Sequence, residues 1–339
     1  MTPRIIIEDR IPYIQGLLEP MAQVTYLPGS EITREAIAEA QALIVRTRTR
    51  CDAQLLQGSK VQFIGSATIG TDHIDLDYCR QAGITVASAP GCNAPAVAQW
   101  TLASIALWLK KEHLHPTEVT LGVVGVGHVG SIVARWAEQC GITVLRNDPP
   151  RALAEGSDGF SSLEQLQAQC HIITFHTPLT LEGEFATWHL CDKHFLDNTR
   201  QCQLVLNAAR GAVCDTQALL DWDGDLALDC WENEPRISKP LLNKAFIATP
   251  HIAGYSSEGK MRGTAMVIEA LNRHFGWSIE PQWPLAPASG AEQVNLAAIL
   301  GSYDPLTDTA MLKDNAADFE ALRNHYALRS EFSNITFSN

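Results

Sequence analysis

Short apolar runs alternate with amphipathic stretches from the start of the chain, and this alternation predicts its elements. Runs of about three to five aliphatic residues suit buried strands, whereas apolar positions recurring every three or four residues suit helices. In residues 1–93, strands are predicted at 5–7, 24–26, 42–45, 63–66 and 85–87, with helical patterns such as 33–40 and 76–82 between them. This order is typical of an α/β domain built on a parallel sheet.

A second series of the same kind follows a long apolar helix predicted over 94–109. Its strands are predicted at 120–124, 143–145, 172–175, 204–207, 226–228 and 246–248. The helix predicted over 256–275 comes after this series and could return to pack on the first one. The pattern therefore predicts an α/β fold with two doubly wound parallel-sheet domains, the first of them discontinuous.

The predicted domain limits follow from these series. Residues 1–93 and 253–279 form the first domain, 94–252 the second, and 280–339 a short C-terminal α+β segment. Three prolines between 279 and 290 predict a linker at the start of that segment, and 316–331 has the pattern of one amphipathic helix.

The composition of the 339 residues is that of a folded protein with more than one core. Hydrophobic residues make up 46% and charged residues 19%, which excludes a mostly disordered chain. With 25 Lys and Arg against 38 Asp and Glu, the net charge is −13, so we expect neither nucleic acid nor an anionic membrane surface as a partner. The most apolar helical stretch has about half of the roughly 20 residues that a membrane span needs.

The cysteines and the amino terminus bear on location and metal binding. The nine cysteines form no C-x-x-C pair, and the apolar run near the start is too short for a signal peptide, so we expect a cytoplasmic protein with reduced thiols. His189, Cys191 and His194 have a spacing that zinc sites also use, but no second cluster completes four ligands. No metal is predicted.

A glycine-rich loop is the first sign of a ligand. Gly125, Gly127 and Gly130 fit G-x-G-x-x-G between a predicted strand and a predicted helix, the context in which this pattern binds a dinucleotide pyrophosphate. We expect Gly125 to make the tight turn, Gly127 to allow close approach of the cofactor, and Gly130 to let the helix pack on the strand. The intervening His128 and Val129 are expected to contact the cofactor as well.

Asp148 follows the next strand, close to the spacing of about 20 residues expected of an acid that binds the adenosine ribose. A carboxylate at this position repels the 2′-phosphate of NADP and therefore favours NAD. Arg146 and Arg151 beside it keep NADP open as an alternative. A glycine turn without any ligand is the other alternative.

Arg210, Glu234 and His251 each come shortly after a predicted strand of the second series, where ligands bind in open α/β sheets. Arginine can hold a carboxylate through two parallel hydrogen bonds. Histidine can take the proton of a hydroxyl group as hydride leaves for a nicotinamide, and a neighbouring carboxylate fixes its tautomer. Together these residue types suit hydride transfer from a 2-hydroxy acid.

In this order, the glycine loop, Arg210, Glu234 and His251 resemble the D-isomer-specific 2-hydroxyacid dehydrogenases, over about residues 1–280. The resemblance implies that Arg210 binds the substrate carboxylate and that Glu234 and His251 are the acid/base pair. It also implies that the first domain binds substrate and the second binds NAD. Two alternatives stay open: another member of the family, acting on glycerate, lactate or phosphoglycerate, and a corepressor-like protein that senses NAD(H) without turnover.

Finer motifs resemble one branch of that family, which acts on a small phosphorylated hydroxy acid. They lie at 45–47, 67–73, 89–94, 147–151, 174–179 and 251–260. The resemblance implies substrate contacts from Thr47, Thr68 and Tyr255. It implies NAD contacts from Asp148, Thr177, Asp229 and Gly254. His176, beside Thr177, is interpreted first as a structural residue and is a second-rank candidate for a cofactor contact.

Two further expectations concern the phosphate and the oligomer. Arg46, Arg48 and Arg50 form a basic cluster in an acidic protein, as a substrate phosphate would require, and Arg46 is the favoured ligand; a solvated charge run is the alternative. The branch carries a C-terminal dimerisation domain. Residues 303–304 and 319–326 of this chain resemble the first part of that domain. We therefore expect a homodimer formed through a shortened C-terminal segment.

Overall fold

The computed structural model describes residues 2–281, 283 and 294–332, and the chain divides into two compact units. One unit comprises Met1–Asn93 and Ser256–Pro287, and the other Ala94–Tyr255 and Ala288–Asn339. Each unit is built on its own parallel sheet, so the predicted fold class is confirmed. Within the described residues, no helix is both long enough and apolar enough to cross a membrane.

The sheet of the first unit has the strand order β2-β1-β3-β4-β5, with every neighbouring pair parallel. Its strands are β1 (Arg4–Glu8), β2 (Gln23–Leu27), β3 (Ala42–Val45), β4 (Phe63–Ser66) and β5 (Thr85–Ala87). Its helices are the short α1 (Arg34–Ile37), α2 (Ala53–Leu56) and α3 (Leu76–Gln81), the long α11 (Ser257–Phe275), and the 3-10 turn η1 (Gly29–Glu31).

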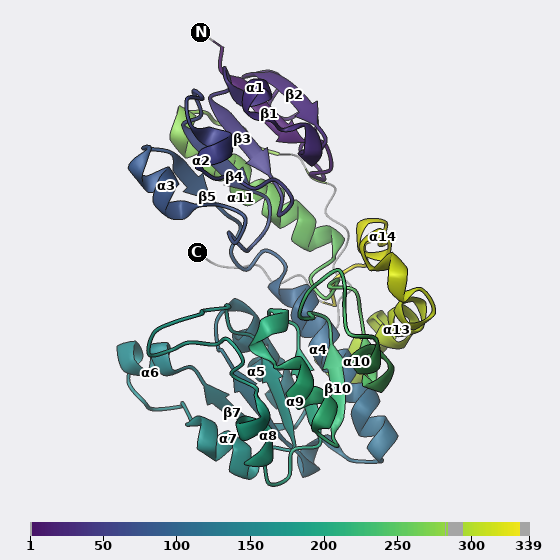
Figure 1. Cartoon of the computed structure of the whole chain (residues 1–339). Coiled ribbons are helices and arrows are strands. Elements are labelled where there is room, and N and C mark those ends of the chain that lie inside the picture. Colours follow the sequence, from purple (N-terminus) through teal and green to yellow (C-terminus); the bar gives the residue numbers. More distant parts are fainter. Residues whose placement is uncertain (1, 282, 284–293, 333–339) are drawn as a thin grey trace. The chain divides into compact units, whose positions relative to one another are not determined.

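Alternation along the strands gives this sheet two buried faces. Ile5 and Ile7 of β1 belong to the core with α11, whereas Ile6 belongs to the core on the opposite face. Figure 1 shows α11 beside β4, although the two are far apart in the sequence. Gly65 of β4 makes this approach possible, because a Cβ there would lie 2.7 Å from Val267 Cγ1 of the helix.

The second unit has a six-stranded sheet in the order β11-β10-β9-β8-β6-β7. The strands are β6 (Thr120–Val124), β7 (Thr143–Asn147), β8 (Ile172–Phe175), β9 (Leu204–Asn207), β10 (Asp225–Leu228) and β11 (Ile247–Ala248). Its helices are α4 (Ala94–Glu112), α5 (His128–Gln139), α6 (Pro149–Glu155), α7 (Leu163–Gln169), α8 (Lys193–Asp197), α9 (Thr216–Asp221) and α10 (Lys239–Lys244). The turns η2 (Pro116–Glu118) and η3 (Gly211–Val213) complete it.

The C-terminal segment belongs to the second unit and packs on it. It contains α12 (Leu296–Ser302), α13 (Pro305–Asp314), the turn η4 (Ala316–Asp318) and α14 (Phe319–Asn324). Ile299 of α12 joins one core of this unit, and Leu312 and Phe319 join the other. Helix α13 also covers the edge strand, because the Ala248 amide donates to Thr309 Oγ1 at 3.0 Å.

The single helix predicted over 316–331 is wrong. The helical part ends at Asn324, and the chain leaves the helix there. A continued helix would carry Arg329 away from its observed partners, since its guanidinium donates to the backbone carbonyls of Ala96, Ile252 and Tyr255. Tertiary hydrogen bonds therefore override the local amphipathic pattern.

Candidate active site

The glycine loop joins β6 to α5 and has the geometry of a dinucleotide loop. Gly125 has φ +86°, a left-handed conformation that glycine adopts freely, and a Cβ there would lie 2.8 Å from the backbone of His176. A Cβ on Gly130 would lie 1.9 Å from the Gly125 carbonyl oxygen, so α5 can begin here only with glycine. Apart from its two chain neighbours, none of the described residues lies within 4 Å of the position of a Gly127 Cβ.

The amino end of α5 is open to an anionic ligand. Gly127 is its N-cap, and no described side chain caps the helix there. The residues Gly127 and His128 are exposed, and Val129 is half-buried. Unpaired amides and the helix dipole at such an end attract a phosphate group. The contacts of this loop with a cofactor stay a prediction.

Asp148 lies at the end of β7 and caps α6. Its Oδ2 accepts a hydrogen bond from the Val126 amide at 2.8 Å, and its Oδ1 accepts one from the Arg151 amide at 3.2 Å. The carboxylate therefore links the glycine loop to the next strand, at the position of a ribose-binding acid. An ionised carboxylate has about four acceptor sites, so capacity for ribose hydroxyls is left.

Arg146 and Arg151, the two arginines that made NADP an alternative cofactor, already have carboxylate partners. Arg151 binds Glu155 through both Nε and Nη2 at 2.7 Å, and Arg146 Nη2 lies 2.7 Å from Glu138 Oε2. Guanidinium groups held in this way are poorly placed to meet an additional phosphate. The neighbourhood of Asp148 thus suits NAD better than NADP.

The loop after β8 faces the glycine loop and carries polar atoms that lack partners. The Thr177 Oγ1 and His176 Nδ1 atoms are buried and bond to none of the described residues, while His176 Nε2 lies 3.0 Å from Thr174 Oγ1. Burial lowers the pKa of His176 to about 3, so the ring is neutral near neutral pH. Orphaned buried groups beside the glycine loop fit a site that a polar cofactor completes.

Glu234 and His251 come from the loops after β10 and β11 and bond to each other. His251 Nδ1 lies 2.7 Å from Glu234 Oε2, and Glu234 Oε1 accepts from the Trp231 amide at 2.7 Å. Burial acts to raise the pKa of Glu234, but the hydrogen bond and charge of His251, the Trp231 amide and the charge of Arg323 together hold this pKa below its usual value. The ionised carboxylate therefore requires the proton on Nδ1, which leaves Nε2 as the basic nitrogen.

Cys230 adds a thiol to this pair. The Cys230 sulfur, a Glu234 carboxylate oxygen and a His251 ring nitrogen all lie within 4.8 Å of one another. Among the described residues, they form the group of side chains that could hold a metal ion. Burial raises the pKa of Cys230 well above its usual value, so the sulfur stays protonated. His189, considered for a metal from the sequence, lies 2.7 Å from Glu232 and 3.1 Å from Asp215.

Asp229 fixes the backbone of the loop that carries His251. It is 1% exposed, and its oxygens accept from the Thr249 hydroxyl at 2.6 Å and from the amides of Ile252 and Ala253 at 2.8 and 3.0 Å. Burial raises the pKa of Asp229 although these donors act against it. The three donors show how Asp229 supports the His251 loop, and its direct contact with NAD stays a prediction, as does that of Gly254.

Arg210 stands on the loop after β9, which Asn207 shapes. Asn207 Nδ2 donates to the Arg210 carbonyl at 2.9 Å, and its Oδ1 accepts from the Ala209 amide at 3.0 Å. The next residue must be glycine, because a Cβ on Gly211 would lie 2.0 Å from the Trp231 carbonyl group. This close approach brings the Arg210 loop against the loop of Glu234.

The C-terminal segment contributes two arginines to the same region, and sequence reasoning missed both. Arg323 Nε donates to Tyr255 Oη at 3.2 Å. Arg329 donates to the carbonyls of Ile252 and Tyr255 at 3.0 and 3.1 Å. The signal available in the sequence was the resemblance of 319–326 to a dimerisation domain, which points to another role.

In the first unit, Arg46 already has an acidic partner. Its Nε and Nη2 bind Glu8 Oε1 at 2.8 and 2.7 Å, and its amide donates to Glu8 Oε2 at 2.9 Å. Glu8 is 1% exposed, so Arg46 neutralises a buried carboxylate. Arg50 pairs with Asp52 at 2.9 Å. The basic cluster expected to hold a phosphate is thus largely engaged in ion pairs.

The other residues expected at the substrate differ in exposure. Thr47 is exposed, and Thr68 is half-buried with its hydroxyl 2.8 Å from Ser66 Oγ. Their contacts with substrate stay predictions.

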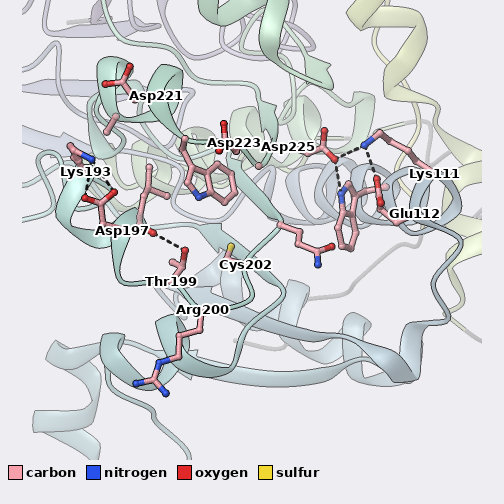
Figure 2. Close-up of a pocket in the computed structure, with 16 residues that line it drawn as sticks. Lys111, Glu112, Lys193, Asp197, Thr199, Arg200, Cys202, Asp221, Asp223 and Asp225 are labelled. Carbon is pink, nitrogen blue, oxygen red and sulfur yellow. Dashed lines mark hydrogen bonds and ion pairs between the residues drawn. The ribbon is translucent and has the colours of Figure 1, made fainter.

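A cavity of about 620 Å³ lies elsewhere in the second unit, at the end of the sheet opposite to the catalytic loops. It is bordered by residues just before or at the start of β9 and β10 and by the end of α4, such as Gln203, Asp225 and Trp108. Figure 2 shows two sets of ion pairs among its charged side chains: Lys111 bonds to Asp225 and Glu112, and Lys193 to Asp197. Ligands of open parallel sheets bind at the carboxyl ends of the strands, so this cavity is not the site of the chemistry.

Comparison with known proteins bears directly on this arrangement. Residues 98–253 match the model of the family described as D-isomer specific 2-hydroxyacid dehydrogenase, NAD binding domain. A protein of Bacteroides thetaiotaomicron named erythronate-4-phosphate dehydrogenase is 46% identical over 338 residues, which cover 97% of each chain. A protein of the same name from Chromohalobacter salexigens is 42% identical, over 98% of this chain and 93% of that one.

Solved structures share the fold. The TT0316 protein of Thermus thermophilus covers 84% of this chain and 100% of its own, with a TM-score of 0.67 and 25% identity. A D-lactate dehydrogenase of Aquifex aeolicus, complexed with NAD and lactic acid, covers 80% of this chain and 96% of its own, with a TM-score of 0.64 and 24% identity. The chain belongs to the D-isomer specific 2-hydroxyacid dehydrogenases and, within them, to the erythronate-4-phosphate dehydrogenases.

Proposed function

We propose that this NAD-dependent dehydrogenase oxidises 4-phospho-D-erythronate at C2 to (3R)-3-hydroxy-2-oxo-4-phosphobutanoate, a step of pyridoxal 5′-phosphate biosynthesis. The observation that carries the chemistry is the 2.7 Å contact between Glu234 and His251, on the same sheet as the glycine loop. The relatives named erythronate-4-phosphate dehydrogenase, which match nearly the whole chain, support the substrate.

The roles of the three catalytic residues follow from their chemistry. Arg210 binds the substrate carboxylate and orients C2. His251 takes the C2 hydroxyl proton at Nε2, while Glu234 holds the Nδ1 proton and stabilises the imidazolium that forms. NAD, when bound, would supply the hydride acceptor for C2, so that with the proton taken by His251 the alcohol would lose two electrons and two hydrogens and become a ketone.

The residues that would hold NAD surround the carboxyl ends of β6, β7 and β8. The amides of the glycine loop bind the pyrophosphate and Asp148 the ribose. The unpartnered Thr177 hydroxyl gives a further buried polar contact. His128, Val129, Asp229 and Gly254 complete the predicted cofactor contacts.

Substrate binding and assembly complete the proposal. Thr47, Thr68 and Tyr255 are the predicted substrate contacts. The favoured assembly is a homodimer in the cytoplasm, formed through the C-terminal segment. The net charge of −13 on each chain favours a protein that binds neither nucleic acid nor anionic membranes.

The test is nicotinamide absorbance with purified protein, NAD and 4-phospho-D-erythronate, with D-3-phosphoglycerate and D-lactate in parallel. A 2-oxo acid in separate wells reoxidises cofactor that is released slowly. Reduction confined to phosphoerythronate supports the proposal, and reduction with another acid would overturn the substrate. The Arg210→Ala variant is expected to lose turnover while it still binds NAD, and loss of NAD binding would contradict the role of Arg210.

A further inference from the structure

The Arg323 guanidinium is enclosed but poorly paired. Arg323 lies on α14, and its side chain is 19% exposed. Among the residues that the structure describes, it makes one hydrogen bond, from Nε to Tyr255 Oη at 3.2 Å, and one ion pair, from Nη1 to Glu320 Oε1 at 3.8 Å. A guanidinium has five N–H donors, so most of its capacity is unused. Burying a cation without a close anion is costly, which favours a ligand that supplies one.

The position of Arg323 places this charge beside the catalytic pair. Tyr255 follows His251 on the same loop. The charge of Arg323 also helps to lower the pKa of Glu234, whereas burial acts to raise it. An anion bound by Arg323 and the Tyr255 hydroxyl would therefore lie next to Glu234 and His251.

Two other arginines show what a structural guanidinium looks like in this chain. Arg46 has a close anion, because its Nε and Nη2 lie 2.8 and 2.7 Å from the buried carboxylate of Glu8. Arg329 donates to several carbonyls and to Gln99 Oε1, and it lies 4.2 Å from the ring centre of Tyr303. The protein thus supplies close acceptors for both guanidiniums. Arg323 comes from the same segment as Arg329, but its described partners lie at 3.2 and 3.8 Å.

We propose that Arg323, together with the Tyr255 hydroxyl, binds the phosphate group of the substrate. This inference rests on the proposed function. A phosphomonoester carries a charge of about −1.5 to −2 near neutral pH and three acceptor oxygens, which match the forked donors of arginine. Arg210 is assigned to the carboxylate on a different loop, so the two anionic ends of the substrate have separate partners. The phosphate ligand moves from Arg46, where the sequence placed it, to Arg323.

The experiment compares Arg323→Met and Arg323→Lys with wild type, using 4-phospho-D-erythronate, D-erythronate and inorganic phosphate as a competitor. Loss of charge-assisted hydrogen bonds is expected to lower the ratio of kcat/KM for the phosphorylated over the unphosphorylated acid by roughly 10- to 100-fold. Inhibition by inorganic phosphate should weaken in parallel. The lysine variant, which keeps the charge but not the fork, should lose less.

Arg329→Met is the matched control, because Arg329 contacts the same loop with a saturated guanidinium. It is expected to lower kcat/KM for both acids without changing their ratio. An unchanged ratio in Arg323→Met would overturn the inference, and where that variant does not fold, an unchanged ratio in Arg323→Lys would do so. If wild type turns over another hydroxy acid but not phosphoerythronate, the proposed function fails; competition by inorganic phosphate then still tests Arg323 independently.

Discussion

His251 Nδ1 and Glu234 Oε2 lie 2.7 Å apart, on loops that follow two neighbouring strands of one sheet. Parallel strands bring their carboxyl ends to a common edge, so residues distant in the sequence meet there. The contact sets the tautomer: with the carboxylate ionised, Nδ1 carries the proton and Nε2 can accept one. The acid/base function therefore depends on Glu234 as an oriented anion.

Replacing Glu234 with glutamine tests that dependence. The Glu234→Gln variant keeps the size of the side chain but removes the charge that stabilises the imidazolium, so kcat should fall by about 100-fold or more. The affinity for NAD, measured by quenching of tryptophan fluorescence, should stay at the wild-type value. A variant that keeps wild-type kcat would show that Glu234 is not part of the proton-transfer machinery.

Removing Arg46 should damage folding of the first unit. Arg46→Met leaves the buried Glu8 carboxylate without its cation, at a cost of about 3 kcal/mol in the free energy of unfolding. The second change Glu8→Gln removes the stranded charge and should recover much of that loss. Urea unfolding of both single variants and the double variant measures the coupling. Purely additive effects would mean that the Arg46–Glu8 ion pair contributes nothing to stability.

Strands such as β3, β4 and β8 could be predicted from the sequence because burial on both faces makes each of them a short apolar run. The predicted 42–45, 63–66 and 172–175 coincide with β3, β4 and β8. The C-terminal helices were harder to predict from the sequence. Helices α12 and α13 are short, and their docking on α4 and β11 decides their structure more than their own periodicity does.

The residues of the candidate site divide in the same way. The glycine loop and Asp148 could be located because their spacing along the chain reflects local geometry. The partner of Arg46 could not be located from the sequence, because Glu8 is 38 residues earlier. It becomes a neighbour only through the pairing of β1 with β3, where Ile7 lies opposite Ile44. The contact of Arg323 with Tyr255, 68 residues apart, likewise depends on how the C-terminal segment packs.

The glycines of the loop should separate cofactor binding from folding. Gly127→Ala places a methyl group in open space where the pyrophosphate is expected, so NAD affinity should fall while stability changes by about 1 kcal/mol or less. Gly130→Ala places its methyl group against the Gly125 carbonyl, so stability should fall by roughly 3 kcal/mol or more. Thermal unfolding and NAD titration of both variants check this. Equal NAD affinity in Gly127→Ala and wild type would place the pyrophosphate elsewhere.

The enclosed His176 should make the second unit sensitive to acid. Its folded-state pKa of about 3 lies below the ordinary value of 6.5, so between these two pH values the unfolded chain binds a proton that the folded chain does not. Stability is therefore fully present above pH 6.5 and is lost as the pH falls toward 3, by at most about 1.4 kcal/mol per pH unit. Relative to His176→Gln, the wild type should lose stability faster between neutral and mildly acidic pH.

Urea unfolding over this range measures the difference. The variant His194→Gln, at an exposed histidine, is the control and is expected to follow the wild type. Parallel pH profiles for wild type and His176→Gln would show that His176 takes up its proton in the folded state as readily as in the unfolded one.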